Sequence, residues 1–116
     1  MSEFTIYHNP RCSKSRQTLA LLEENGVTPQ VVLYLDTPPD AAALKALLGK
    51  LGIEARALLR KGEEAYKAEG LADTGLDDDM LVAAMVAHPK LIERPIVVKG
   101  DRAVLGRPPE NVMELL

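Results

Sequence analysis

Short apolar segments alternate with a longer segment of helical periodicity in the first third of the chain. Residues 4–7 and 30–35 are rich in aromatic and β-branched side chains, which is typical of strands. Between them, from Ser13 onward, apolar residues recur at helical spacing until Asn25 and Gly26 end the pattern. A strand, a helix and a second strand in this order predict a βαβ unit with two parallel strands.

The middle of the chain has a helical pattern that glycines interrupt. Thr37 and Pro38 are typical of a helix start, with Thr37 as the predicted N-cap, and we expect this helix to end at Gly52. Three more helices are predicted, over residues 55–59, 63–69 and 77–88. The last of these begins with three aspartates, whose charge suits a helix N-terminus.

The last part of the chain predicts a hairpin and a final helix. Residues 96–99 and 102–105 flank a Gly-Asp turn, and two prolines at 108–109 open a helix that reaches the C-terminus. The whole pattern predicts an α/β, thioredoxin-like (glutaredoxin-like) fold: βαβ, helical insert, then ββα, with a four-stranded mixed sheet. We expect one domain, residues 1–116, with the helical insert at about 37–90.

Composition argues against several classes of protein. A net charge of −3 and only 3% aromatic residues argue against a nucleic-acid binder, which needs basic surface and stacking platforms. Apolar runs are too short to span a bilayer, and the N-terminus lacks the pattern of a signal peptide. We therefore expect a cytoplasmic protein that does not bind membranes, and a monomer, because no sustained apolar seam is left over.

The chain contains a single cysteine, Cys12, which therefore cannot form an intramolecular disulfide. It falls where the first strand turns into the first helix. Unpaired N–H groups and the positive end of the helix dipole favour a thiolate there and can also bind an oxyanion. His8, Arg11, Lys14 and Arg16 add positive or titratable charge nearby. The pattern predicts a reactive thiolate that acts on a small oxyanion; the alternative is a small buried hydrophobic residue.

The residues around Cys12 exclude related chemistries. A phosphatase-type loop requires Arg at position 18, which is Thr, and a Cys-x-x-Cys dithiol requires Cys at position 15, which is Ser. The only histidines are His8 and His88, so soft ligands are too few for a metal site, and we expect none. Ser15 is expected to hydrogen-bond locally in the first helical turn, and a contact with the thiolate stays open.

Four motifs together resemble the ArsC-type, glutaredoxin-dependent arsenate reductases. They are His-Asn-Pro-x-Cys at 8–12, Ala-Leu-Leu-Arg-Lys at 57–61, Arg-Pro-Ile-Val-Val at 94–98 and Gly-Arg-Pro at 106–108. The resemblance covers essentially the whole chain, in order and at matching separations. Longer members of the family extend beyond the position of Leu116, a difference that leaves the matched Cys and Arg positions intact.

The resemblance implies a role for each matched residue. Cys12 matches the catalytic cysteine, and His8 matches the histidine that supports its thiolate. The oxyanion-binding arginines of the family match Arg60, Arg94 and Arg107. Guanidinium groups suit this role because they bind tetrahedral oxyanions through paired N–H donors. Pro95 is implied to be a cis proline beside Cys12, and we expect it to be a structural residue of the site, as is Ser15 from its place in the first helical turn.

The resemblance also implies substrates and partners: arsenate or a similar oxyanion, glutathione as co-substrate, glutaredoxin as partner, and no tightly bound cofactor. Reduction of arsenate to arsenite takes two electrons, and a single cysteine needs an external thiol to supply them. Two alternatives stay open. One is a regulator resembling Spx that binds RNA polymerase, although its common Cys-x-x-Cys switch is broken here at Ser15. The other is a non-catalytic module that binds glutathione or an anion.

Overall fold

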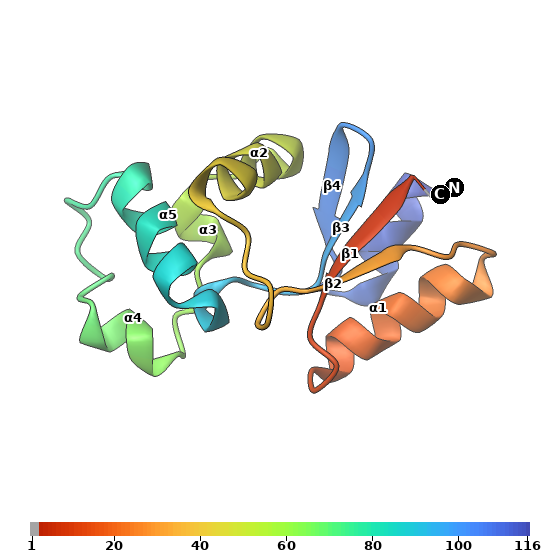
Figure 1. The fold of residues 1–116 in the computed structure, drawn as a ribbon, viewed down its shortest axis with the longest axis horizontal. Coiled ribbons are helices and arrows are strands. Elements are labelled where there is room, and N and C mark those ends of the chain that lie inside the picture. Colours follow the sequence, from red (N-terminus) through yellow and green to blue (C-terminus); the bar gives the residue numbers. More distant parts are fainter. Residues whose placement is uncertain (1–2) are drawn as a thin grey trace. The chain divides into compact units, whose positions relative to one another are not determined.

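The computed structural model describes residues 3–116 and divides into two compact units (Figure 1). The sheet unit is formed by the chain up to Thr37 together with Arg94–Leu116, and the helical unit is Pro38–Glu93. The helical unit therefore interrupts the sheet unit in sequence, between the second and third strands. The expectation of one domain with an insert at about 37–90 stays a prediction.

The sheet unit contains one four-stranded mixed sheet, in the order β2-β1-β3-β4. Its strands are β1 (Phe4–His8), β2 (Gln30–Leu33), β3 (Ile96–Lys99) and β4 (Arg102–Leu105). β1 pairs with β2 in parallel and with β3 antiparallel, and β3 pairs with β4 antiparallel. This topology confirms the predicted thioredoxin-like fold. It places the end of β1, from which the chain continues to Cys12, in the middle of the sheet.

The core of the sheet unit lies between one face of the sheet and two helical segments, α1 (Ser13–Glu24) and the 3₁₀ helix η2 (Pro109–Leu115). Figure 1 shows α1 running along the sheet. The buried cluster consists of Phe4, Ile6, Leu22, Val97, Val112 and Leu115. Burial of these apolar side chains is the main force that fixes α1, and hence its N-terminus, against the sheet.

The helical unit is built around α5 (Asp78–Ala87), which contacts α2, α3 and the 3₁₀ helix η1. The other elements are α2 (Ala41–Leu51), α3 (Ala55–Leu58), α4 (Glu64–Ala68) and η1 (Pro89–Leu91). α2 ends at Gly52, whose left-handed backbone (φ +68°) favours glycine. At the start of α5 the Asp77 side chain accepts a hydrogen bond from the N–H of Met80.

Two sequence predictions about helices are wrong, one about a cap and one about the type of helix. Thr37 is not the N-cap of α2: Asp40 is, because its carboxylate accepts a 2.8 Å hydrogen bond from the Ala43 N–H. A proline disfavours helical backbone angles in the residue before it, so Pro39 keeps Pro38 out of the helix. The predicted C-terminal α-helix is instead the 3₁₀ helix η2. Its buried residues Pro109, Val112 and Leu115 recur every third position, which matches three residues per turn.

The second predicted strand is shorter than expected, because β2 stops at Leu33 and the chain turns at residues 34–37. β2 is also an edge strand of the sheet. In the part of the chain that the structure describes, residues 3–116, no helix has the length and apolar character needed to cross a membrane.

Candidate active site

The single cysteine lies at the junction between β1 and α1. Cys12 is the N-cap of α1, with an extended backbone (φ −94°, ψ 123°), and its side chain makes no capping hydrogen bond. Asn9 closes the preceding turn. Its backbone carbonyl accepts from the Cys12 N–H, and its Oδ1 accepts from the Arg11 N–H, both at 3.0 Å. These two bonds fix the turn and hold Cys12 at the start of the helix.

The first turn of α1 suits a negatively charged group. It contains no acidic residue, and the first N–H groups of a helix have no acceptor within the helix. Arg11 and Lys14 are exposed, and Arg16 NH1 donates to the Pro10 carbonyl at 2.9 Å. Backbone donors and cationic side chains therefore both favour an anion at this end of α1.

Ser15 ties the first turn of α1 to the end of β1. Its fully buried hydroxyl is hydrogen-bonded to His8 Nδ1 at 2.6 Å and accepts from the Asn9 N–H at 3.0 Å. His8 is only 6% exposed. Burial, followed by the positive charge of Arg16, lowers the pKa of His8 below its usual 6.5. The lowered pKa favours the neutral form of His8, and a role of His8 in supporting the Cys12 thiolate stays a prediction.

Arg107 is brought to Cys12 from the far end of the sequence. Its NH1 lies 3.9 Å from the Cys12 sulfur and donates to the Arg94 carbonyl at 3.2 Å. The structure thus brings together two of the three predicted arginines and the cysteine, all within the sheet unit. Arg107 contacts the sulfur through its side chain, and Arg94 holds Arg107 through its backbone carbonyl.

The chain around Pro95 and Gly106 supports this arrangement. The Arg94–Pro95 peptide bond is cis, as expected, and Arg107–Pro108 is cis as well, whereas the position of Pro95 beside Cys12 stays a prediction. The buried Pro95 accepts a 2.9 Å hydrogen bond from the Gly106 N–H. The segment that carries Arg107 is therefore attached directly to the segment that carries Arg94.

Arg60, the third predicted arginine, belongs to the helical unit. Its N–H donates to the Leu91 carbonyl at 2.8 Å. Its side chain is 25% exposed, and its guanidinium lies between two carboxylates, with NH1 3.5 Å from Glu63 Oε1 and Nε 3.6 Å from Glu93 Oε1. A role of Arg60 toward an oxyanion stays a prediction.

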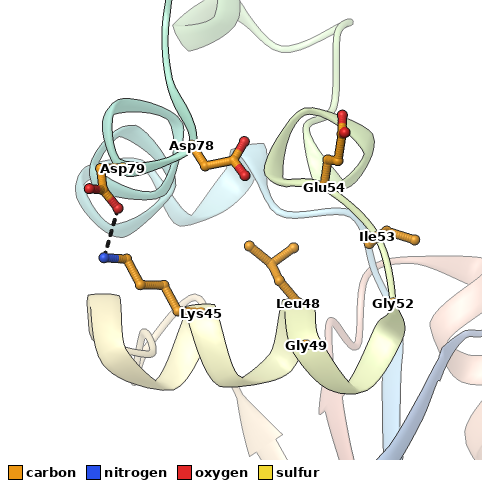
Figure 2. A pocket seen from close by; sticks show the side chains of 8 residues that line it. All are labelled: Lys45, Leu48, Gly49, Gly52, Ile53, Glu54, Asp78 and Asp79. Atoms are coloured by element: carbon orange, nitrogen blue, oxygen red, sulfur yellow. Dashed lines mark ion pairs between the residues drawn. The ribbon is translucent and has the colours of Figure 1, made fainter.

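The helical unit also contains a pocket of about 570 Å³ (Figure 2). Its lining residues are Lys45, Leu48, Gly49, Gly52, Ile53, Glu54, Asp78 and Asp79. The exposed Lys45–Asp79 ion pair (2.8 Å) crosses between α2 and α5, and it raises the pKa of Lys45. This lining contains no cysteine, serine or threonine. Within residues 3–116, moreover, His, Cys, Asp and Glu form no group of three or more that could hold a metal ion.

Sequence reasoning missed three residues that build the site: Asn9, Thr18 and Asn111. Asn9 could have been found, because Asn before Pro is a turn signal and its side chain commonly bonds the backbone two residues on. Thr18 Oγ1 lies 3.3 Å from the Gly106 carbonyl, and Asn111 Nδ2 lies 3.2 Å from the Arg107 carbonyl. The first contact joins residues far apart in the sequence, and the second joins a helix to an irregular loop, so no local sequence pattern indicates either.

The fold and the site together define a class: thioredoxin-like proteins that place a single cysteine at the start of the first helix, with an arginine at its sulfur. Comparison with known proteins narrows this class to one family. The sequence profile of the ArsC family matches residues 7–115, and the chain belongs to that family.

Several relatives are similar over nearly their whole length. An arsenate reductase from Neisseria meningitidis serogroup A is 50% identical over 117 residues, which cover 100% of both chains. The uncharacterized protein YfgD of Escherichia coli K12 is 60% identical over 112 residues, covering 96% of this chain and 94% of YfgD. The solved structure of an arsenate reductase from Vibrio cholerae is 58% identical, with a TM-score of 0.95 over 97% of each chain.

Proposed function

We propose that this protein is an arsenate reductase in which Cys12 is the nucleophile and glutathione and glutaredoxin are the external reductants. The observation that carries the proposal is the contact between Arg107 NH1 and the Cys12 sulfur, at the acid-free N-terminus of α1. A cation and a helix N-terminus at one sulfur are what an attack on an oxyanion requires. The arsenate reductases among its relatives support the same substrate.

The proposed reduction of arsenate has two steps, and two thiols supply its two electrons. The Cys12 sulfur attacks arsenic, forms an S–As bond and releases one arsenate oxygen as water. Glutathione then supplies the second sulfur: an S–S bond forms, the S–As bond breaks with its electron pair on arsenic, and arsenite leaves. Overall, arsenic acid and two thiols give arsenious acid, one disulfide and water. A glutaredoxin thiol finally takes the glutathionyl group from Cys12 and restores its thiol.

The arginines have distinct proposed roles. Arg107 binds the oxyanion at the sulfur and stabilises charge as it moves during attack, because a guanidinium presents several N–H donors in a fixed plane. For Arg94 and Arg60, a role as further oxyanion-binding residues rests on the ArsC-type motifs that they match. A monomer in the cytoplasm fits it too, because a reducing compartment keeps a lone cysteine as a free thiol.

A coupled assay tests the proposal. Purified protein is mixed with arsenate, glutathione, glutaredoxin, glutathione reductase and NADPH, and arsenate-dependent NADPH consumption is followed. We expect activity in the wild type, none in Cys12→Ser, and a strong loss in Arg107→Gln. The matched control is Arg102→Gln, an exposed arginine of β4 that donates to the Glu114 carbonyl and should keep full activity. Full turnover in Cys12→Ser, or none in a folded wild type, would contradict the proposal.

A further inference from the structure

The loop between β4 and η2 carries Arg107 and is held at several points before its side chain reaches Cys12. Gly106 packs so closely that an added Cβ would lie 2.6 Å from Thr18 Oγ1 and 2.8 Å from Pro95 Cγ. The Gly106 N–H also donates to the Pro95 carbonyl at 2.9 Å. Gly106 is thus fixed between α1 and the start of β3.

Asn111, on η2, holds the residues on either side of Gly106. Its Nδ2 donates to the Leu105 carbonyl at 3.1 Å and to the Arg107 carbonyl at 3.2 Å. An amide nitrogen has two hydrogens, so a single side chain satisfies both carbonyls. The backbone N–H of Asn111 also donates to the Pro108 carbonyl at 3.0 Å. Asn111 therefore donates to three backbone carbonyls in and beside this loop.

We propose that Asn111 is a positioning residue that sets the Arg107 guanidinium relative to the Cys12 sulfur. The inference deepens the proposed function and rests on it only for the role of Arg107 toward arsenate. Its physical basis is that the Arg107 carbonyl and Cα belong to one rigid peptide unit, so a bond to the carbonyl restrains the origin of the side chain. From that origin NH1 spans to both the Arg94 carbonyl and the sulfur.

A positioning role differs from a purely structural one in what Asn111 changes. Loss of its two bonds leaves the charge of Arg107 in place but lets the guanidinium sample positions farther from the sulfur. The positive electrostatic potential at Cys12, which attracts an approaching anion, is then lower. A generally destabilised fold, by contrast, would change access to Cys12 for neutral and anionic molecules alike.

The test compares the rates at which iodoacetate, an anion, and iodoacetamide, its neutral counterpart, alkylate the protein. Only Cys12 can react as a cysteine, so intact mass reports the site directly. The rate with iodoacetate divided by the rate with iodoacetamide measures the positive electrostatic potential at the sulfur. We expect Arg107→Gln to lower this ratio about threefold at low salt. Asn111→Leu, which has similar shape and no donor, should lower it about twofold.

The matched control is Asn25→Leu. Asn25 Nδ2 likewise donates to a backbone carbonyl, that of Leu21 at 2.8 Å, but at the opposite end of α1 from Cys12. We expect its ratio to equal that of the wild type. Asn111→Ala provides a second variant in case the leucine is not accommodated, and urea unfolding confirms that each variant is folded.

A double variant decides whether Asn111 acts through Arg107. In the Arg107→Gln background, Asn111→Leu should cause no further change, since the charge that it positions is already gone. An unchanged ratio in both Asn111 variants, an equal fall in Asn25→Leu, or a second fall in the double variant would each overturn the inference. In the arsenate assay Asn111→Leu should mainly raise KM. Absence of arsenate turnover, with the ratios as expected, would refute the proposed function and leave this inference standing.

Discussion

The close contact at Gly106 predicts that one added methyl group disturbs both stability and site. In Gly106→Ala the new Cβ would lie 2.6 and 2.9 Å from Thr18 Oγ1 and Cγ2, whereas ordinary contacts are 3.4–4 Å. Thr18 and Pro95 belong to a helix and to a buried segment, so the loop itself must move, by about 0.5–1 Å. Such overpacking costs about 1–3 kcal/mol of unfolding free energy. A shift of this size at Arg107 lowers activity by up to about 100-fold.

Gly49→Ala is the matched control, with the opposite expected sign. Gly49 lies within α2, and apart from its chain neighbours and the backbone of its own helix no atom lies within 4 Å of its ideal Cβ position. Alanine is the better helix former, so this change should raise the unfolding free energy by about 0.5–1 kcal/mol. Urea unfolding and the coupled arsenate assay measure both effects. If Gly106→Ala is as stable and active as the wild type, or if Gly49→Ala destabilises equally, the packing argument fails.

Two further predictions concern titration and capping. The pKa of His8 lies below the 6.5 of an unfolded histidine, so the unfolded state binds more protons as the pH falls below 6.5. The stability that the neutral, buried His8 contributes is complete above pH 6.5 and is lost as the pH falls through the folded pKa. A ring-carbon NMR titration of His8 with a midpoint at or above 6.5 would refute this prediction. Asp40→Ala should cost about 1 kcal/mol by urea unfolding, because a carboxylate cap of α2 is lost. Glu54→Ala should cost far less, because the Glu54 side chain makes no capping bond to α3, and equal costs would contradict the capping argument.

The fold was largely predictable because its signals are local. The hairpin 96–105 has its predicted bounds, since a Gly-Asp turn separates two apolar runs and Gly100 adopts a left-handed backbone (φ +60°). The helix from Ser13 likewise starts where predicted. Errors arose where two signals competed, as at Thr37 and Asp40. Another arose where a period of three, seen only in the packing of η2, replaced the α-helical period.

The site was predictable only in part, for the same reason. Cys12 at a helix start follows from the neighbouring residues. Its pairing with Arg107 joins positions 95 residues apart, and only the family resemblance indicated that arginine. Nothing in the sequence indicated Asn111, because a lone polar residue near a C-terminal helix has no periodicity or spacing that marks a function. Such supporting residues emerge only when the backbone carbonyls that they bind are placed in space.

The N-cap position of Cys12 has a mechanical consequence. At Cys12 itself the helix is held by the backbone, because the Cys12 carbonyl accepts from the Arg16 N–H at 3.0 Å while the sulfur makes no capping bond. The sulfur can therefore exchange one covalent neighbour for another, and α1 loses no hydrogen bond in the process. In the proposed cycle, thiolate, arsenic adduct and mixed disulfide would all rest on the same unaltered scaffold. Covalent changes at the Cys12 sulfur would therefore leave the hydrogen bonds of the helix start intact.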